Sequence, residues 1–183
     1  TINSSDLSSL PIYFNKNYSD KKSHLITING SGLNTISGMF CFNNELTSLN
    51  VSNNPKLKTL EILKNKLKDI DISKNIELTE LNCTWNQLKS LDVTKNTLLE
   101  ILSCENNQLT SLNVCNNTKL MSLFLRSNQL NSNQLNNLFK TLHKNKIWEK
   151  TIYIGGNPGA ENCDKSIATR KGWIVDSKPV EFK

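Results

Sequence analysis

Apolar and polar positions along this chain recur with a period of 21 residues, which matches neither a single helix nor a single strand. Several apolar columns at this step accompany two columns of asparagine. This pattern indicates a stack of coils, because one coil cannot bury its apolar stripe alone and must share a core with its neighbours. The first asparagine column consists of Asn44, Asn65, Asn86, Asn107 and Asn128, and the second consists of Asn54, Asn75, Asn96 and Asn117.

Each repeat contains a segment in which two apolar residues flank one free position, which is the alternation of a β-strand. The segments Leu60–Ile62, Leu81–Cys83 and Leu102–Cys104 are therefore expected to be neighbouring strands of a parallel sheet, one per coil. A second alternating segment, Leu49–Val51 and its equivalents, predicts either a second strand in each coil or an extended turn.

The asparagine column that begins at Asn44 has a structural interpretation. Where a coil turns, backbone N–H and C=O groups point inward without a strand partner, and leaving them unpaired in the core is costly. A buried Asn amide offers two donors and an acceptor, so stacked copies can satisfy these groups from coil to coil. We therefore predict that this column forms a ladder inside the core.

Residues 81–99, LNCTWNQLKSLDVTKNTLL, show the repeat most clearly. The pattern resembles leucine-rich repeats, specifically the short 21-residue type of exported and cell-surface proteins of anaerobic gut and oral bacteria, and the resemblance covers about residues 36–130. It implies an α/β leucine-rich repeat solenoid. It also implies a non-catalytic extracellular or cell-surface module that binds a protein of the host or of the envelope, or, as a less favoured option, a glycan.

The whole chain, 1–183, is expected to form one repeat domain with modified ends. Residues 1–35 are predicted to contain a polar partial cap or linker and a degenerate first coil, with a strand near Leu25–Ile28. Regular repeats occupy residues 36–130, and residues 131–183 form a C-terminal cap.

The cap is predicted to begin with an amphipathic helix, with Ser132 as its N-cap. TIYIGGNPG (151–159) predicts a strand and a tight turn. Asp164 is expected to cap a short helix that ends at Gly172, before a strand from Trp173. This helix–strand–helix order also resembles the cap of the same bacterial proteins. The apolar residues of the first helix, at i, i+3, i+4 and i+7, are Leu135, Leu138, Phe139 and Leu142.

The formal net charge of +6 is spread along the chain rather than gathered in one segment. Dispersed lysines are typical of a solvated surface, and no basic and aromatic module of the nucleic-acid-binding kind is present, so nucleic acid is not an expected partner. No apolar run reaches the ~20 residues that span a bilayer. The chain begins at Thr1, so a signal peptide or a lipid anchor upstream stays open.

The cysteines and histidines do not predict a catalytic or metal site. Cys41, Cys83 and Cys104 share an inward column with Ile62 and Leu125, which indicates that these thiols act as small hydrophobic side chains. Five cysteines, an odd number, do not indicate a disulfide framework. The sequence leaves open whether Cys115 pairs with Cys163.

The sequence also gives little support for a metal site or for a catalytic nucleophile. His24 and His143 lie far apart in the sequence, and no Cys/His spacing suits zinc. The segment NKNYSD (15–20) lacks the central Gly of a calcium loop and is better interpreted as a surface loop. For Cys163 and His143 no third, orienting group is suggested, so we predict no cofactor and no enzymatic activity.

The outward strand positions are where the repeat leaves the residue type free, and several of them are apolar. Exposed aromatics at an interface often supply most of its binding energy. An alternative is that the aromatics near the ends, Phe40, Phe42 and Phe124, pack under the caps, which leaves Trp85 in the middle as the hardest to explain structurally. The predicted protein-binding residues are Glu61, Leu63, Glu80, Asn82, Trp85, Ile101, Glu105, Phe124 and Arg126.

The opposite flank of the coils carries an outward column of Asn50, Asp71, Asp92 and Asn113. Its two carboxylates could attract a cation, but solvated turns are the favoured interpretation, because the repeat itself specifies Asp or Asn there. At the level of function, the alternatives to a binding module are a structural stalk or adhesin segment and an accessory module of a larger surface protein.

Overall fold

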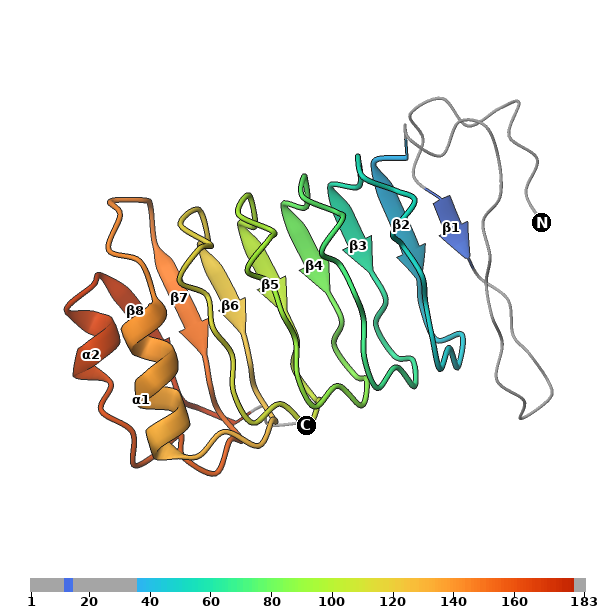
Figure 1. The fold of residues 1–183 in the computed structure, drawn as a ribbon. Helices are drawn as coiled ribbons and strands as arrows, with labels where there is room; N and C mark the ends of the chain where they lie inside the picture. The colour runs from blue at the N-terminus through green and yellow to red at the C-terminus, as the bar shows by residue number, and fades with distance from the viewer. Residues whose placement is uncertain (1–11, 15–35, 180–183) are drawn as a thin grey trace.

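A computed structural model describes residues 12–14 and 36–179, which form an elongated stack of coils with one parallel sheet (Figure 1). The eight strands pair in sequence order. The strands are β1 (Ile12–Phe14), β2 (Gly38–Cys41), β3 (Thr59–Glu61), β4 (Glu80–Asn82), β5 (Ile101–Ser103), β6 (Ser122–Phe124), β7 (Lys150–Tyr153) and β8 (Trp173–Asp176).

The strand register confirms the 21-residue repeat. Leu60 pairs with Leu81, and Leu81 pairs with Leu102, so equivalent positions of successive coils lie side by side. The step differs at the two ends of the sheet, where Ile12 pairs with Met39 and where Leu123 pairs with Ile152 after an inserted helix. The predicted parallel strands are therefore present in the regular repeats, each beginning and ending one residue earlier than predicted.

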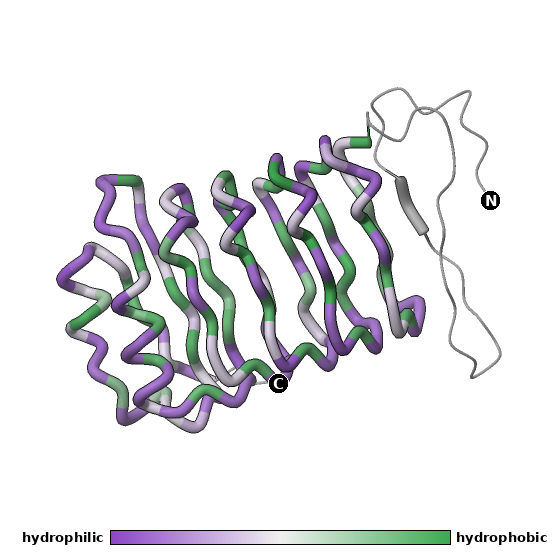
Figure 2. Tube along the Cα trace, in the orientation of Figure 1, coloured by the Kyte–Doolittle hydropathy of each residue, from purple (hydrophilic) through white to green (hydrophobic). Residues whose placement is uncertain are grey.

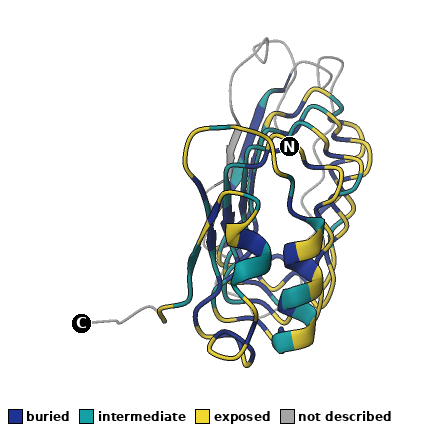
Figure 3. Cartoon of the chain, turned by 90° about the vertical axis from the view of Figure 1, so that its left-hand side faces the viewer, coloured by how far each residue is buried: buried dark blue, intermediate teal, exposed yellow. Residues whose placement is uncertain are grey.

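The apolar columns form one continuous core inside the coils. Figure 2 shows apolar and polar segments alternating along each coil, and Figure 3 views the stack from the end that the two helices cover. The column that packs behind the sheet is fully buried along its length, as expected for the inward position of each strand. This column consists of Met39, Leu60, Leu81, Leu102 and Leu123.

The asparagine ladder is present, and each rung links two coils. The amide nitrogen of Asn86 donates to the carbonyl oxygens of Ile62 (2.9 Å) and Cys83 (3.0 Å), and its Oδ1 accepts from the Leu67 N–H (3.1 Å). Asn107 repeats this arrangement one coil later, where its Oδ1 accepts from the Leu88 N–H. The ladder therefore satisfies turn groups that the strands leave unpaired.

Asn157 of the GNPG segment is a further rung that the sequence reading missed. Its amide donates to the carbonyl oxygens of Leu125 (2.9 Å) and Ile154 (2.8 Å), and its Oδ1 accepts from the Leu130 N–H (3.1 Å). The signal was present, because Asn157 follows Ile154 by three residues, as Asn107 follows Cys104. The helix inserted before β7 hides this rung from a search at a fixed period.

The second alternating segment of each coil is an extended turn rather than a strand. Asp71 Oδ1 accepts from the Ser73 N–H (2.9 Å), and Asp92 Oδ1 accepts from the Thr94 N–H (2.9 Å). Such Asx turns hold the chain out of a strand ladder and bend it toward the next segment. The outward Asn and Asp column is thereby explained as turn chemistry.

The C-terminal cap has the predicted helix–strand–helix order, with one correction at its start. Helix α1 (Ser132–Thr141) begins one residue earlier than predicted, because Asn131 and not Ser132 is the N-cap. Asn131 and Gln134 form a reciprocal capping box, which satisfies two backbone donors instead of one. The buried face of α1 consists of Leu135, Leu138 and Phe139.

The second helix of the cap, α2 (Ser166–Thr169), also differs slightly from its prediction. Its N-cap residue is Lys165, while Asp164 Oδ1 accepts from the Ser166 N–H (3.0 Å) one residue upstream. Gly172 then takes a positive φ of 79° and leads into β8, as its predicted role as a helix stop requires.

At the N-terminal end, β1 pairs in parallel with β2. The sequence reading assigned this segment to a cap or linker, so β1 is a strand that it missed. The strand predicted near Leu25–Ile28 and the loop at 15–20 lie outside the described residues.

Candidate functional site

The nine residues predicted to bind a partner lie on the strands or just after them. Five belong to strands β3 to β6, and the other four, Leu63, Trp85, Glu105 and Arg126, follow the strand ends by two or three residues. Strand alternation turns Leu60 and its equivalents inward, and their neighbours Glu61 and Thr59 outward. None of the nine predicted residues is buried, and Trp85 is the most exposed aromatic side chain among them. The repeat therefore fixes the backbone of this face and leaves its chemistry to the individual side chains.

Trp85 combines exposure with an unusual backbone conformation. Its side chain is 47% exposed, and its φ is +57°. This left-handed conformation recurs in the same column of every regular coil and in the cap, at Asn43, Lys64, Asn106, Ser127 and Gly156. A bulky aromatic residue is an outlier in the left-handed φ/ψ region, which Gly and Asn adopt more readily.

Two acidic side chains of the face precede Trp85 along the chain, and Glu80 lies five residues before it, at the start of β4. Glu61 and Glu80 occupy neighbouring strands, β3 and β4, and both are half-buried. Burial raises the pKa of Glu61, and the negative charge of Glu80 raises it further. Leu63 and Ile101 add partly exposed apolar surface to this face. Ile101 pairs with Glu80 at the start of the strands, and Leu63 follows the end of β3.

The C-terminal end of the face is occupied by contacts within the chain. Phe124 stacks on Tyr153 with ring centroids 4.6 Å apart, and the Arg126 guanidinium lies 4.5 Å from the centroid of the same ring. Arg126 also forms ion pairs with Asp176 (2.9 Å) and Glu105 (3.5 Å). The alternative of packing at the ends therefore describes Phe124 well.

Sequence reasoning missed Tyr153 and Asp176 in this cluster. Tyr153 aligns with Phe124 once TIYI is recognised as a further strand of the repeat, because β6 and β7 pair in that register. Asp176 follows from the pairing of β8 with β7, since Tyr153 and Asp176 are register partners. Both lie beyond the point where the fixed period breaks.

The buried thiols behave as core side chains. Burial raises the pKa of Cys41 to about 12, and the pKa of Cys104 is also raised, by the neighbouring Cys83 thiol and by burial. All five cysteines are free, with Cys115 exposed and Cys163 buried. Among the residues that the structure describes, no group of three His, Cys, Asp or Glu side chains is placed to hold a metal ion.

Comparison with known proteins supports the fold directly. No known family profile and no curated protein matches the sequence, but solved structures do. Internalin InlF of Listeria monocytogenes has 24% identity and a TM-score of 0.66 over 83% of this chain and 43% of its own. The functional domain of InlJ of the same organism, described as including a cysteine ladder, has 29% identity and a TM-score of 0.52 over 76% of this chain and 34% of its own. The leucine-rich repeat domain of a Shigella effector has 23% identity and a TM-score of 0.52 over 84% of this chain and 66% of its own.

These likenesses and the stacked coils establish a leucine-rich repeat solenoid as the fold of this chain, and they support a bacterial type. The chain spans 34% and 43% of the two internalin chains. The narrower resemblance to proteins of gut and oral anaerobes stays a prediction. Neither helix in the described ranges is long and apolar enough to cross a bilayer.

Proposed function

We propose that this chain is a non-catalytic recognition module that binds a protein partner through the Trp85 patch, defined as Glu61, Leu63, Glu80, Trp85 and Ile101. Solenoids of this kind generally use the extended face of their sheet for binding. The observation that carries the proposal is Trp85, a half-exposed aromatic side chain held in a backbone conformation that disfavours it. Because the repeat imposes this conformation on every regular coil, the support comes from the choice of a bulky Trp at position 85, a strained choice of the kind found at functional sites.

The composition of the patch indicates the chemistry of the partner. Leu63 and Ile101 add partly exposed apolar surface to the same face, which favours a protein over a glycan. The carboxylates of Glu61 and Glu80 favour Lys or Arg on the partner's rim. Asn82, Glu105, Phe124 and Arg126 lie on the same face around the patch, the last three in the contacts described above. On the family resemblance, the site of action is extracellular or on the outer cell surface.

The proposal is tested with Trp85→Asn, which removes the indole and suits the left-handed backbone. Wild-type protein captures partners from host and envelope extracts, and each partner's affinity is then measured by surface plasmon resonance. We expect Trp85→Asn to weaken binding at least ~30-fold, the loss typical of a central aromatic anchor.

The matched control is Ile76→Asn, because Ile76 is an exposed apolar side chain (56%) that lies outside the strands. Its affinity should equal that of the wild type. Unchanged affinity of Trp85→Asn for every captured partner contradicts the proposal. If no substitution on the strand face changes the affinity for any partner, the alternative of a structural stalk or accessory module is favoured.

A further inference from the structure

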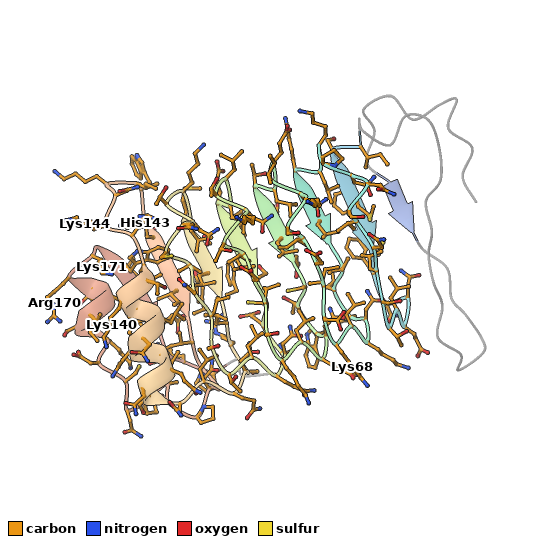
Figure 4. The ribbon with its side chains drawn as sticks, viewed as in Figure 1. Lys68, Lys140, His143, Lys144, Arg170 and Lys171 are labelled. Atoms are coloured by element: carbon orange, nitrogen blue, oxygen red, sulfur yellow. The ribbon has the colours of Figure 1, made fainter. Side chains whose placement is uncertain are left out.

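The C-terminal cap contains a hollow lined mainly by cationic residues. Its volume is about 460 Å³, and Ile147, Asn145 and Gly172 complete its wall. Figure 4 shows Lys144, Arg170 and Lys171 gathered at this end of the stack, far from Lys68. The five cationic residues that line the hollow are Lys144, Lys146, Lys150, Arg170 and Lys171.

Backbone carbonyl groups, rather than carboxylates, hold two of these cations in place. The Lys150 ammonium donates to the carbonyl oxygens of Asn145 and Lys171, both at 2.8 Å. The Lys171 ammonium donates to the carbonyl oxygen of Leu142 at 2.7 Å. Within residues 36–179, none of the five cations forms an ion pair. The hollow therefore concentrates positive charge. Hydrogen bonds from Ser166 lower the pKa of the Asp164 carboxyl, and Arg170 is near enough for its charge to help lower it.

Two exposed apolar side chains are close in sequence to residues that line the hollow. Trp148 is 91% exposed in the loop between α1 and β7, and Ile174 is 52% exposed on the last strand, β8. Lys144 and Lys146 precede Trp148 by four and two residues, and both are exposed. Glu149 is the one carboxylate in the loop of residues 143–149.

We propose that this end of the molecule, the cap surface of Lys144, Lys146, Trp148, Arg170 and Lys171, docks on a membrane of anionic phospholipids. Lipid phosphates match the clustered cations of the hollow, and a basic cluster near a membrane gains affinity with each Lys or Arg. Trp148 suits the headgroup region of a membrane, which an amphipathic indole prefers to both water and hydrocarbon.

Docking through the cap leaves the Trp85 patch available. Trp148 lies in the loop that follows α1 at the end of the stack, whereas Trp85 lies in a middle coil (Figure 1). The proposal is independent of the Trp85 patch, and each can fail without the other. A soluble anionic polymer offers a similar charge, but it has no apolar region that could bury the exposed Trp148 indole.

The test is co-sedimentation of the full chain with vesicles of phosphatidylcholine, with and without phosphatidylglycerol. We expect binding only to the phosphatidylglycerol vesicles, and weaker binding as salt is added. Lys144→Ala/Lys146→Ala should lower the partition coefficient about 25-fold, from roughly five-fold for each lysine. Trp148→Ala should lower it about five-fold or more.

The control is Lys68→Ala/Lys89→Ala, which removes two exposed lysines from the regular coils and should bind as the wild type does. Equal losses in this control and in Lys144→Ala/Lys146→Ala would overturn the proposal, because binding would then follow net charge alone. Two other results would also overturn it. One is equal binding to both vesicle types, and the other is binding to heparin or polyphosphate without binding to vesicles.

Discussion

At the scale of single residues, the repeat determines the backbone at position 85 and leaves the side chain to other demands. Equivalent coils place Asn, Lys or Ser in the same left-handed conformation, and the cap places Gly156 there. Gly and Asn adopt this conformation at little cost, whereas the β-carbon of Lys, Ser or Trp raises the cost to about 1–2 kcal/mol, and the bulky ring makes Trp the least expected of them. Folding alone gives no reason for an exposed tryptophan at this position.

Replacing Trp85 by Asn should therefore raise the free energy of unfolding by about 1 kcal/mol. The expected gain comes from relief of backbone strain, since a half-exposed indole loses little packing. The measurement is urea unfolding followed by far-UV circular dichroism. Trp148→Asn, which also removes an exposed indole, should change stability by less than about 0.5 kcal/mol. A loss of stability in Trp85→Asn would show that the indole serves the fold.

At the scale of the elements, the asparagine ladder supplies hydrogen bonds between neighbouring coils, as strand pairing does along the sheet. The carbonyl oxygen of Ile62 receives amides from Asn65 of its own coil and Asn86 of the next. The Leu67 N–H, in contrast, has only the Asn86 side chain as its partner among the interactions of the described residues. Loss of the Asn86 side chain therefore leaves the buried Leu67 N–H without this partner. It also removes one of the two side-chain amides that donate to each of the Ile62 and Cys83 carbonyl oxygens.

Asn86→Leu should lower the free energy of unfolding by about 2–3 kcal/mol, although leucine is more apolar than asparagine. Equilibrium urea unfolding measures the change. Asn53→Leu is a suitable control, because Asn53 is exposed and should shift stability by less than about 0.5 kcal/mol. Equal stability of Asn86→Leu and the wild type would mean that the ladder contributes nothing.

The junction between α1 and the last coil depends on a neutral histidine. The Asn145 N–H donates to His143 Nδ1 (3.2 Å), so Nε2 carries the proton and donates to the Leu120 carbonyl oxygen (2.8 Å). Burial lowers the pKa of His143, and the charges of Lys150 and Lys171 lower it further, against the effect of the bond to Leu120.

A lowered pKa in the folded state means that the unfolded chain binds this proton more tightly. The stabilisation is complete above about pH 6.5, the ordinary pKa of histidine, and is lost as the pH falls through the folded value. Between pH 7 and pH 5, the wild type should therefore lose more stability than His143→Gln, measured by urea unfolding at each pH. His24 is common to both proteins and cancels in the difference. Parallel pH profiles would contradict the argument.

Particular elements show how far the sequence could predict this fold. The strands, the ladder and the buried columns follow from a fixed period, because each coil repeats the same contacts with its neighbour. Asn157 and Tyr153 were missed where an inserted helix breaks that period. The partners of Phe124 and Arg126 could not be predicted, since they come from β7 and β8 and depend on how the cap docks. The hollow of the cap was missed for the same reason.

At the scale of the whole molecule, stability passes from coil to coil, so the two ends determine how unfolding begins. The cap covers the last coil with the buried side chains of α1, among them Phe139, and with Trp173, whose indole donates to the His143 carbonyl oxygen (2.9 Å). In a stack of nearest-neighbour contacts, damage at one end loosens that end before the middle.

Phe139→Ala should accordingly unfold the cap before the regular coils. The substitution removes about 3–5 kcal/mol of packing, all of it at the end of the stack. Trp173 reports on the cap, and it becomes the sole tryptophan when Trp85 and Trp148 are replaced by Phe. In that background, Phe139→Ala should shift the fluorescence transition to lower urea than the circular dichroism transition of the sheet, while the parent shows a smaller separation. If both transitions shift together, the coils and the cap unfold as one unit, and coupling along the stack is stronger than contacts between neighbours alone provide.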